Sequence, residues 1–210
     1  MAQGLTMGEP TKIDNPLLAG AGGVTLGEAR TNHQGRKAIL MIRDEENSDE
    51  FEALVATMGI EIVERLNQSG KEDPRGYFGK GRLQDVADEL AATVDGHPWQ
   101  SVDLVLIHNN ASARQLVAVS DAVKVEVWDR VRLLLSLFTS HASSMEARTQ
   151  VRIARLQSDR TVLRELVNLQ TTGERAGYGS SGATALQAVM ENLNREIASL
   201  AKRQQRHANA

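Results

Sequence analysis

The stretch WDRVRLLLSLFTSHASSMEARTQVRIARLQ, from Trp128 to Gln157, decides how the chain is organised. It begins at the end of an apolar run typical of a strand. It continues through a short, almost wholly apolar helix over 131–139 and becomes a long, Arg-rich amphipathic helix from about Ser143. The sequence before this stretch has the pattern of a small α/β domain, and the sequence after it has the pattern of a helical arm.

Composition limits the class of protein. The 210 residues have room for one domain with an appendage or for two small domains. Aromatic residues make up only 3%, so the core must be aliphatic, and the absence of Cys excludes a disulfide framework and Cys-ligated metal. There is no apolar run of about 18 residues and no signal-peptide pattern at the N-terminus. We therefore expect a cytoplasmic protein without a membrane partner.

The net charge of −3 hides an asymmetry between the two halves of the chain. Residues 37–129 carry 9 Lys and Arg against 18 Asp and Glu, whereas residues 130–210 carry 12 against 6. One interpretation is two ordinary solvated surfaces, which charge alone slightly favours. The other is that the basic half faces an anion, most simply phosphates.

Strand-like and helix-like patterns alternate from residue 37 to residue 130. Apolar runs predict strands over 38–42, 60–66, 102–107 and 123–128, and helical spacing predicts the helices between them, one of them capped by Ser112. This order predicts the α/β class, with a small, mostly parallel sheet and flanking helices. Residues 1–36, with seven Gly and two Pro, are predicted to be a flexible N-terminal extension.

Residues 131–210 are predicted to form a helical domain. A helix over 143–169 and another over 183–205 would form a long antiparallel αα-hairpin, a coiled-coil-like arm, joined at a Gly-rich tip over 171–182. We expect Arg148, Arg152, Arg155, Arg160 and Arg164 to reach outward. Leu186, Met190, Leu193, Ile197, Leu200 and Gln204 form a heptad seam. That seam could instead pair two chains in a homodimer, although the short loop fits pairing within one chain better.

No sequence pattern indicates an active site. The chain lacks G-x-x-x-x-G-K-[ST], and the G-x-G-x-x-G match at 177–182 follows a helix rather than a strand. The five His are scattered, without a metal-binding pair. The sequence His108-Asn109-Asn110 follows a buried strand, where α/β proteins place ligands, but a polar turn is the favoured interpretation. We expect no catalytic residue, no metal and no cofactor in this chain.

Several segments together resemble the N-terminal region of the HflX family of ribosome-associated GTPases. They appear in the family's order over about residues 37–206, and the histidine of FTSHA is closer to the archaeal branch. The segments are YFGKGRL (77–83), VDLVLI (102–107), VEVWDR (125–130), LLSLFTSHA (134–142), EARTQVRIARL (146–156) and GYGSSGAT (177–184).

The resemblance implies an α/β subdomain, two long antiparallel helices and then a GTPase domain. It also implies binding to the large ribosomal subunit near the peptidyl-transferase centre, with splitting or rescue of ribosomes. In place of the family's G-P-G-E-T-type loop this chain has SGAT at 181–184, and in place of an acidic pair it has His108-Asn109-Asn110. The missing acidic pair is where a nucleotide role of this region could reside, so we do not expect this region to hydrolyse ATP. The sequence also contains no P-loop up to Ala210.

Three functional hypotheses follow. The first is a protein without GTPase activity that binds large-subunit rRNA, not DNA, and regulates, splits or hibernates ribosomes by occupying their functional centre. Its RNA contacts would be the five arginines named above and the tip residues Arg175, Gly177, Tyr178 and Gly179. The second is the N-terminal part of a complete HflX-type GTPase, with GTP and Mg²⁺ bound in a domain beyond Ala210. The third is a dimerisation module built on the 186–204 seam.

Overall fold

The structure, a computed structural model, describes residues 31–172 and 180–208. Its sheet has the strand order β2-β1-β3-β4, and all three neighbouring pairs are parallel, so the predicted α/β class is confirmed. Strand β4 is shorter than expected, because Val123 ends a helix and Lys124 caps it in a left-handed conformation (φ 58°). The strands are β1 (Lys37–Arg43), β2 (Glu61–Gln68), β3 (Val102–Ile107) and β4 (Glu126–Trp128).

Six helices are described, and local capping positions two of them. The side chain of Ser112 accepts a hydrogen bond from the Gln115 N–H and Gln115 returns one to Ser112, a capping box that starts α4 as predicted. Asp129 accepts from the Arg132 N–H and starts α5 directly after β4. The helices are α2 (Asp49–Thr57), α3 (Lys80–Ala91), α4 (Ala113–Val123), α5 (Arg130–His141), α6 (Met145–Thr171) and α7 (Ser180–Ala208).

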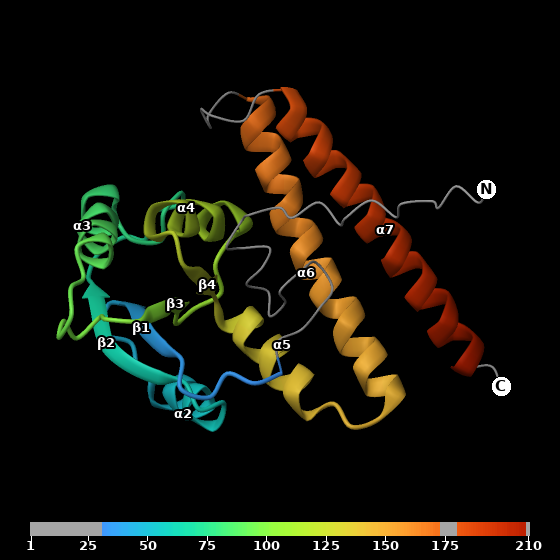
Figure 1. Cartoon of the computed structure of the whole chain (residues 1–210), viewed down its shortest axis with the longest axis horizontal. Helices are drawn as coiled ribbons and strands as arrows, with labels where there is room; N and C mark the ends of the chain where they lie inside the picture. Colours follow the sequence, from blue (N-terminus) through green and yellow to red (C-terminus); the bar gives the residue numbers. More distant parts are fainter. Residues whose placement is uncertain (1–30, 173–179, 209–210) are drawn as a thin grey trace, which may run out of the picture.

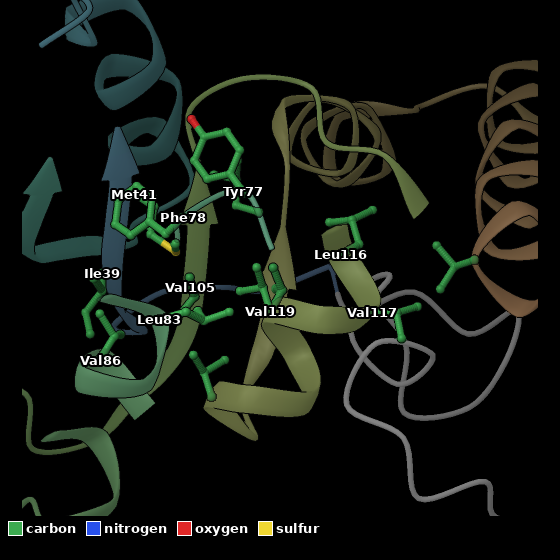
Figure 2. Packing of buried hydrophobic residues seen from close by; sticks show 14 of the residues in the cluster. Ile39, Met41, Tyr77, Phe78, Leu83, Val86, Val105, Leu116, Val117 and Val119 are labelled. Atoms are coloured by element: carbon green, nitrogen blue, oxygen red, sulfur yellow. The ribbon is translucent and has the colours of Figure 1, made fainter. Parts of the chain in front are cut away.

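Side-chain alternation along the strands builds a core on each face of the sheet. On one face, Ile39, Met41 and Val105 pack against α3, α4 and the segment Tyr77–Phe78 (Figure 2). On the other face, alternate strand residues pack against α2 and α5, with Trp128 fully buried among them. The sheet is therefore covered on both sides, as its continuous apolar strands require.

Residues 31–36 belong to the α/β domain and not to the predicted extension. Arg36 is 8% exposed, and its guanidinium donates to Asp103 at 2.9 Å and to Glu126 at 2.7 Å. His33 is buried edge-on against Trp128, with 5.0 Å between ring centroids. These pairs join residues far apart in sequence, so composition alone placed the boundary too late. The first 30 residues lie outside the described part.

Helices α6 and α7 lie side by side and run in opposite directions (Figure 1). The two are called the helix pair below. The helix pair packs directly against the α/β domain. Three of its residues, Val162, Leu163 and Leu186, share one buried cluster with residues of the sheet. Helix α7 begins at Ser180, so assigning 180–182 to a loop was wrong. Ser and Gly are acceptable there because the first-turn N–H groups have no intrahelical partner.

An ion pair joins α2 to the edge strand β2. It makes the free energy of unfolding depend on pH. Glu52 accepts hydrogen bonds from Arg65 Nε and Ser48 Oγ, both at 2.7 Å, and its bond with Arg65 holds the pKa of Glu52 below its ordinary value of 4.5. A lowered carboxyl pKa stabilises the fold above pH 4.5, and that contribution disappears as the pH falls through the folded pKa.

We therefore expect Glu52→Gln to lower the free energy of unfolding at pH 7 by less than about 1 kcal/mol, since Arg65 is largely exposed. Urea unfolding at pH 7 and at pH 3 measures this difference. The gap between the variant and the parent protein should close at pH 3. An equal gap at both pH values would show that the effect comes from packing rather than from charge.

Candidate nucleic-acid interface

The arginines of α6 do not share one outward face. At 100° per residue, Arg148, Arg152 and Arg155 lie on the same side of the helix as Asp159 and Val162. That side is buried in the middle of α6, where Asp159 and Val162 are 2% and 1% exposed. Arg160 and Arg164 lie about 80° and about 120° further round than Arg152. The five positions therefore meet different environments.

Arg155 does not reach outward, and this expectation was wrong. Its residue is 6% exposed, and burial lowers the pKa of its guanidinium, with Asp159 acting in the opposite direction. The physical reason is the i, i+4 relation of Arg155 to Asp159, which puts both side chains on the side that meets α5. Arg155 is part of a buried charged cluster and is not available to an RNA.

The buried charged cluster consists of Arg132 on α5 with Arg155 and Asp159 on α6. Arg132 Nη2 lies 3.3 Å from Asp159 Oδ1, and both residues are 2% exposed. Burial raises the pKa of the Asp159 carboxyl, while the two neighbouring guanidiniums oppose that rise. The cluster fixes the angle of α6 against α5, because moving either helix would separate desolvated charges.

Four of the predicted arginines remain accessible. Arg148 and Arg164 are exposed and Arg160 is half-buried. Arg152 is exposed too, but its Nε donates at 2.7 Å to Glu196 of α7, so part of its charge is neutralised within the helix pair. The nucleic-acid role of these four residues stays a prediction. The predicted tip contacts Arg175, Gly177, Tyr178 and Gly179 lie outside the described residues.

The pairing of α6 with α7 adds cationic side chains of α7 that were not predicted as RNA contacts from the sequence. Lys202, Arg203 and Arg206 on α7 are exposed. The Arg152–Glu196 contact sets an antiparallel register in which the last turns of α7 lie beside the first turns of α6. In the sequence, the net positive charge of residues 130–210 was the one indication of these residues. Their closeness to Arg148 could not be predicted, because it depends on the register of α7 against α6.

A cavity of about 340 Å³ lies where the beginning of α6 faces the end of α7. Met145 on its wall is 69% exposed. This region, the first two turns of α6 with residues 196–206 of α7, is called the open end of the helix pair. The cavity is lined by Met145, Glu146, Thr149, Arg203 and Gln204.

The carboxyl edge of the sheet holds the other polar cluster that the sequence indicated. Glu46, after β1, lies 3.2 Å from His108 Nδ1 and accepts from Asn109 Nδ2 at 2.8 Å. These contacts join the loops that follow β1 and β3 and support the polar-turn interpretation. Within residues 31–172 and 180–208, no group of three His, Asp or Glu is placed to hold a metal ion. Nor does any helix there have the length and apolar character needed to cross a membrane.

The heptad seam of α7 packs within the chain. Leu186 and Leu193 are 7% and 3% exposed, and Leu186 joins the cluster that contains Leu163 of α6. Met190, Ile197 and Leu200 are half-buried. A homodimer that used these positions would first have to separate α7 from α6.

Comparison with known proteins places these features in a family. Residues 45–139 match the family described as the GTP-binding GTPase N-terminal domain. GTPase HflX of Methanocaldococcus jannaschii is 30% identical over 141 residues, 67% of this chain and 33% of that protein. The Caldanaerobacter subterraneus HflX is 31% identical over 159 residues, 73% of this chain and 35% of that protein. The chain thus spans about a third of the length of these relatives.

Solved structures agree on the fold. A GTP-binding protein from Sulfolobus solfataricus, crystallised with GDP, matches with a TM-score of 0.52 at 20% identity over 79% of this chain and 46% of that one. A structure titled as the SsGBP and GDP complex gives a TM-score of 0.54 at 20% identity, covering 81% of this chain and 46% of that one. At such identities the likeness establishes the fold alone.

Proposed function

Because this chain contains the N-terminal domain of the HflX family of GTPases, we propose that it binds the large ribosomal subunit through rRNA, without hydrolysing GTP itself. The observation that carries this proposal is the separation of charge. Residues 37–129 carry twice as many acids as bases, whereas residues 130–210 carry twice as many bases as acids. Phosphates would attract the helix pair and repel the α/β domain, which orients the protein on RNA.

The helix pair suits this role because its exposed cations lie on a rigid element. The buried charged cluster and the shared apolar core both hold α6 against the domain. An arm held in this way loses little conformational entropy on binding. Bound near a functional centre, such a protein would regulate, split or hibernate ribosomes by occupying space, and this partner would place it in the cytoplasm.

The direct test is sedimentation of the 210-residue protein with purified ribosomal subunits over a salt series, without nucleotide. We expect migration with the large subunit that is lost steeply as salt rises, because phosphate contacts release counterions. A GTPase assay of the same preparation should show no hydrolysis, since the chain contains no P-loop. Absence of migration with the large subunit at low salt would contradict the proposal.

A charge-reversal pair identifies the face of α6 that contacts RNA. We expect the double variant Arg160→Glu with Arg164→Glu to bind the large subunit about tenfold more weakly or worse. The slope of the logarithm of the binding constant against the logarithm of the salt concentration should also become less steep, by the amount that corresponds to about two lost phosphate contacts. The matched control is Arg75→Glu with Arg82→Glu, which makes the same charge change at exposed positions of the α/β domain. Equal weakening by both pairs would mean that net charge, and not this face, governs binding.

The length of the relatives favours a second candidate. Proteins about twice as long as this chain carry this domain, and they are GTPases. In that case the chain would position a GTPase domain that binds GTP and Mg²⁺ elsewhere in the protein. Sequencing the gene beyond codon 210 would show whether such a domain follows. The rRNA contacts proposed for α6 apply to both candidates.

A further inference from the structure

We propose that the cavity at the open end of the helix pair binds an unpaired guanine base of single-stranded RNA, with cations at its rim contacting the flanking phosphates. This inference rests on the proposed RNA-binding function and adds to it a site and a base preference. The volume of about 340 Å³ falls in the range of about 300–1,000 Å³ that small-ligand sites occupy. The site is at the opposite end of the helix pair from the last residue of α6, Thr171, and the first residue of α7, Ser180.

The walls of the cavity suit a flat base. Met145 presents an exposed thioether side chain on one wall, and sulfur makes favourable contacts with aromatic rings. Arg203 lines the cavity as well, and guanidinium planes stack on the unpaired bases of single-stranded RNA. Together these side chains offer apolar and cationic contact to the face of a ring.

The polar side chains that α6 contributes to the cavity are acceptors. The Thr149 hydroxyl donates its proton to the Met145 carbonyl oxygen at 2.8 Å, so only its lone pairs remain for a ligand. The carboxylate of Glu146 can only accept, whereas the amide of Gln204 can donate or accept and the guanidinium of Arg203 can only donate. Guanine presents two adjacent N–H donors on its Watson–Crick edge, whereas adenine presents an acceptor at N1. The α6 wall of the cavity therefore matches the Watson–Crick edge of guanine better than that of adenine.

The surrounding charge suits the phosphates on either side of that base. Arg148, Lys202 and Arg206 are exposed around the open end. The Arg148 Nε donates to the Ala142 carbonyl oxygen at 3.0 Å, which holds this side chain near the turn between α5 and α6. Of the acids nearby, Glu196 already accepts from Arg152, and Glu146 lies in the cavity. The rim is thus cationic and the α6 wall of the cavity offers acceptors, as a guanine nucleotide of single-stranded RNA requires.

The experiment is fluorescence anisotropy of the full chain with labelled eight-nucleotide uridine tracts carrying one central guanine or one central adenine. We expect the guanine oligonucleotide to bind about tenfold more tightly, the discrimination typical of one well-formed base contact. Glu146→Gln should reduce this preference to less than about twofold without weakening the binding of the adenine oligonucleotide. Arg203→Glu should weaken both by about tenfold, and Arg82→Glu on α3 should change neither.

The outcomes separate this inference from the proposed function. Equal binding of the two oligonucleotides, or an Arg203→Glu variant that binds like the parent protein, would overturn the guanine site even where the large subunit still binds. Binding of neither oligonucleotide would overturn it as well and would leave the open end as a surface for a protein partner. Circular dichroism of each variant checks that the helices remain, which is expected because these residues are on the surface.

Discussion

Asp159→Ala is expected to lower the free energy of unfolding by about 3–5 kcal/mol, the usual cost of removing one member of a buried ionic group. Asp159 is 2% exposed, and its carboxylate lies between Arg132 and the i−4 residue Arg155. Removing the acid takes a carboxylate away from two buried guanidiniums, which are 2% and 6% exposed. Urea unfolding followed by circular dichroism measures the change.

Two further variants show whether charge is responsible. The triple replacement Arg132→Met, Arg155→Leu and Asp159→Leu removes every charge of the cluster and should recover most of the lost stability. Glu191→Ala removes an exposed acid from α7 and should change the stability by less than about 0.5 kcal/mol. If the triple variant is as unstable as Asp159→Ala, the loss comes from side-chain packing and not from unbalanced charge.

The cluster also shows what local pattern can and cannot predict. The four strands and the capping of α4 by Ser112 follow from apolar runs and from turn chemistry within a few residues. The burial of Arg155 depends on where α6 meets α5. From its sequence alone, an Arg-rich helix is predicted to be exposed, because the sequence does not say which helix packs against it. The burial of Arg36 was not predicted, for the same reason. Its hydrogen bonds to Asp103 and Glu126 join residues that are 67 and 90 positions apart in the sequence.

The candidate interface divides in a similar way. Charge counts predicted which half of the chain is basic, and Arg148, Arg160 and Arg164 are accessible as expected, Arg160 in part. The cavity at the open end could not be predicted, because it forms only when α7 returns beside α6 in one particular register. A shift of one turn would bring other residues of α7 beside Met145. Packing between distant segments therefore decides the fine structure of the interface.

The same packing decides whether the helix pair folds as its own unit. Leu163 is completely buried in the cluster that includes Val105 of the sheet and Val119 of α4. Leu200, near the open end, is only half-buried. If α6 is part of the core, damage at Leu163 must reach the whole protein, whereas damage at Leu200 should stay local.

We therefore expect Leu163→Ala to lower the free energy of unfolding by about 2–5 kcal/mol and Leu200→Ala to lower it by less than about 1 kcal/mol, since little cavity forms at a half-exposed site. Circular dichroism follows mainly α6 and α7, while fluorescence follows Trp99 and Trp128, both in the α/β domain. The two signals should shift together in Leu163→Ala. A dichroism transition that moves while the fluorescence transition stays in place would instead identify the helix pair as an independently folding arm. An RNA partner could then reorient the arm against the α/β domain.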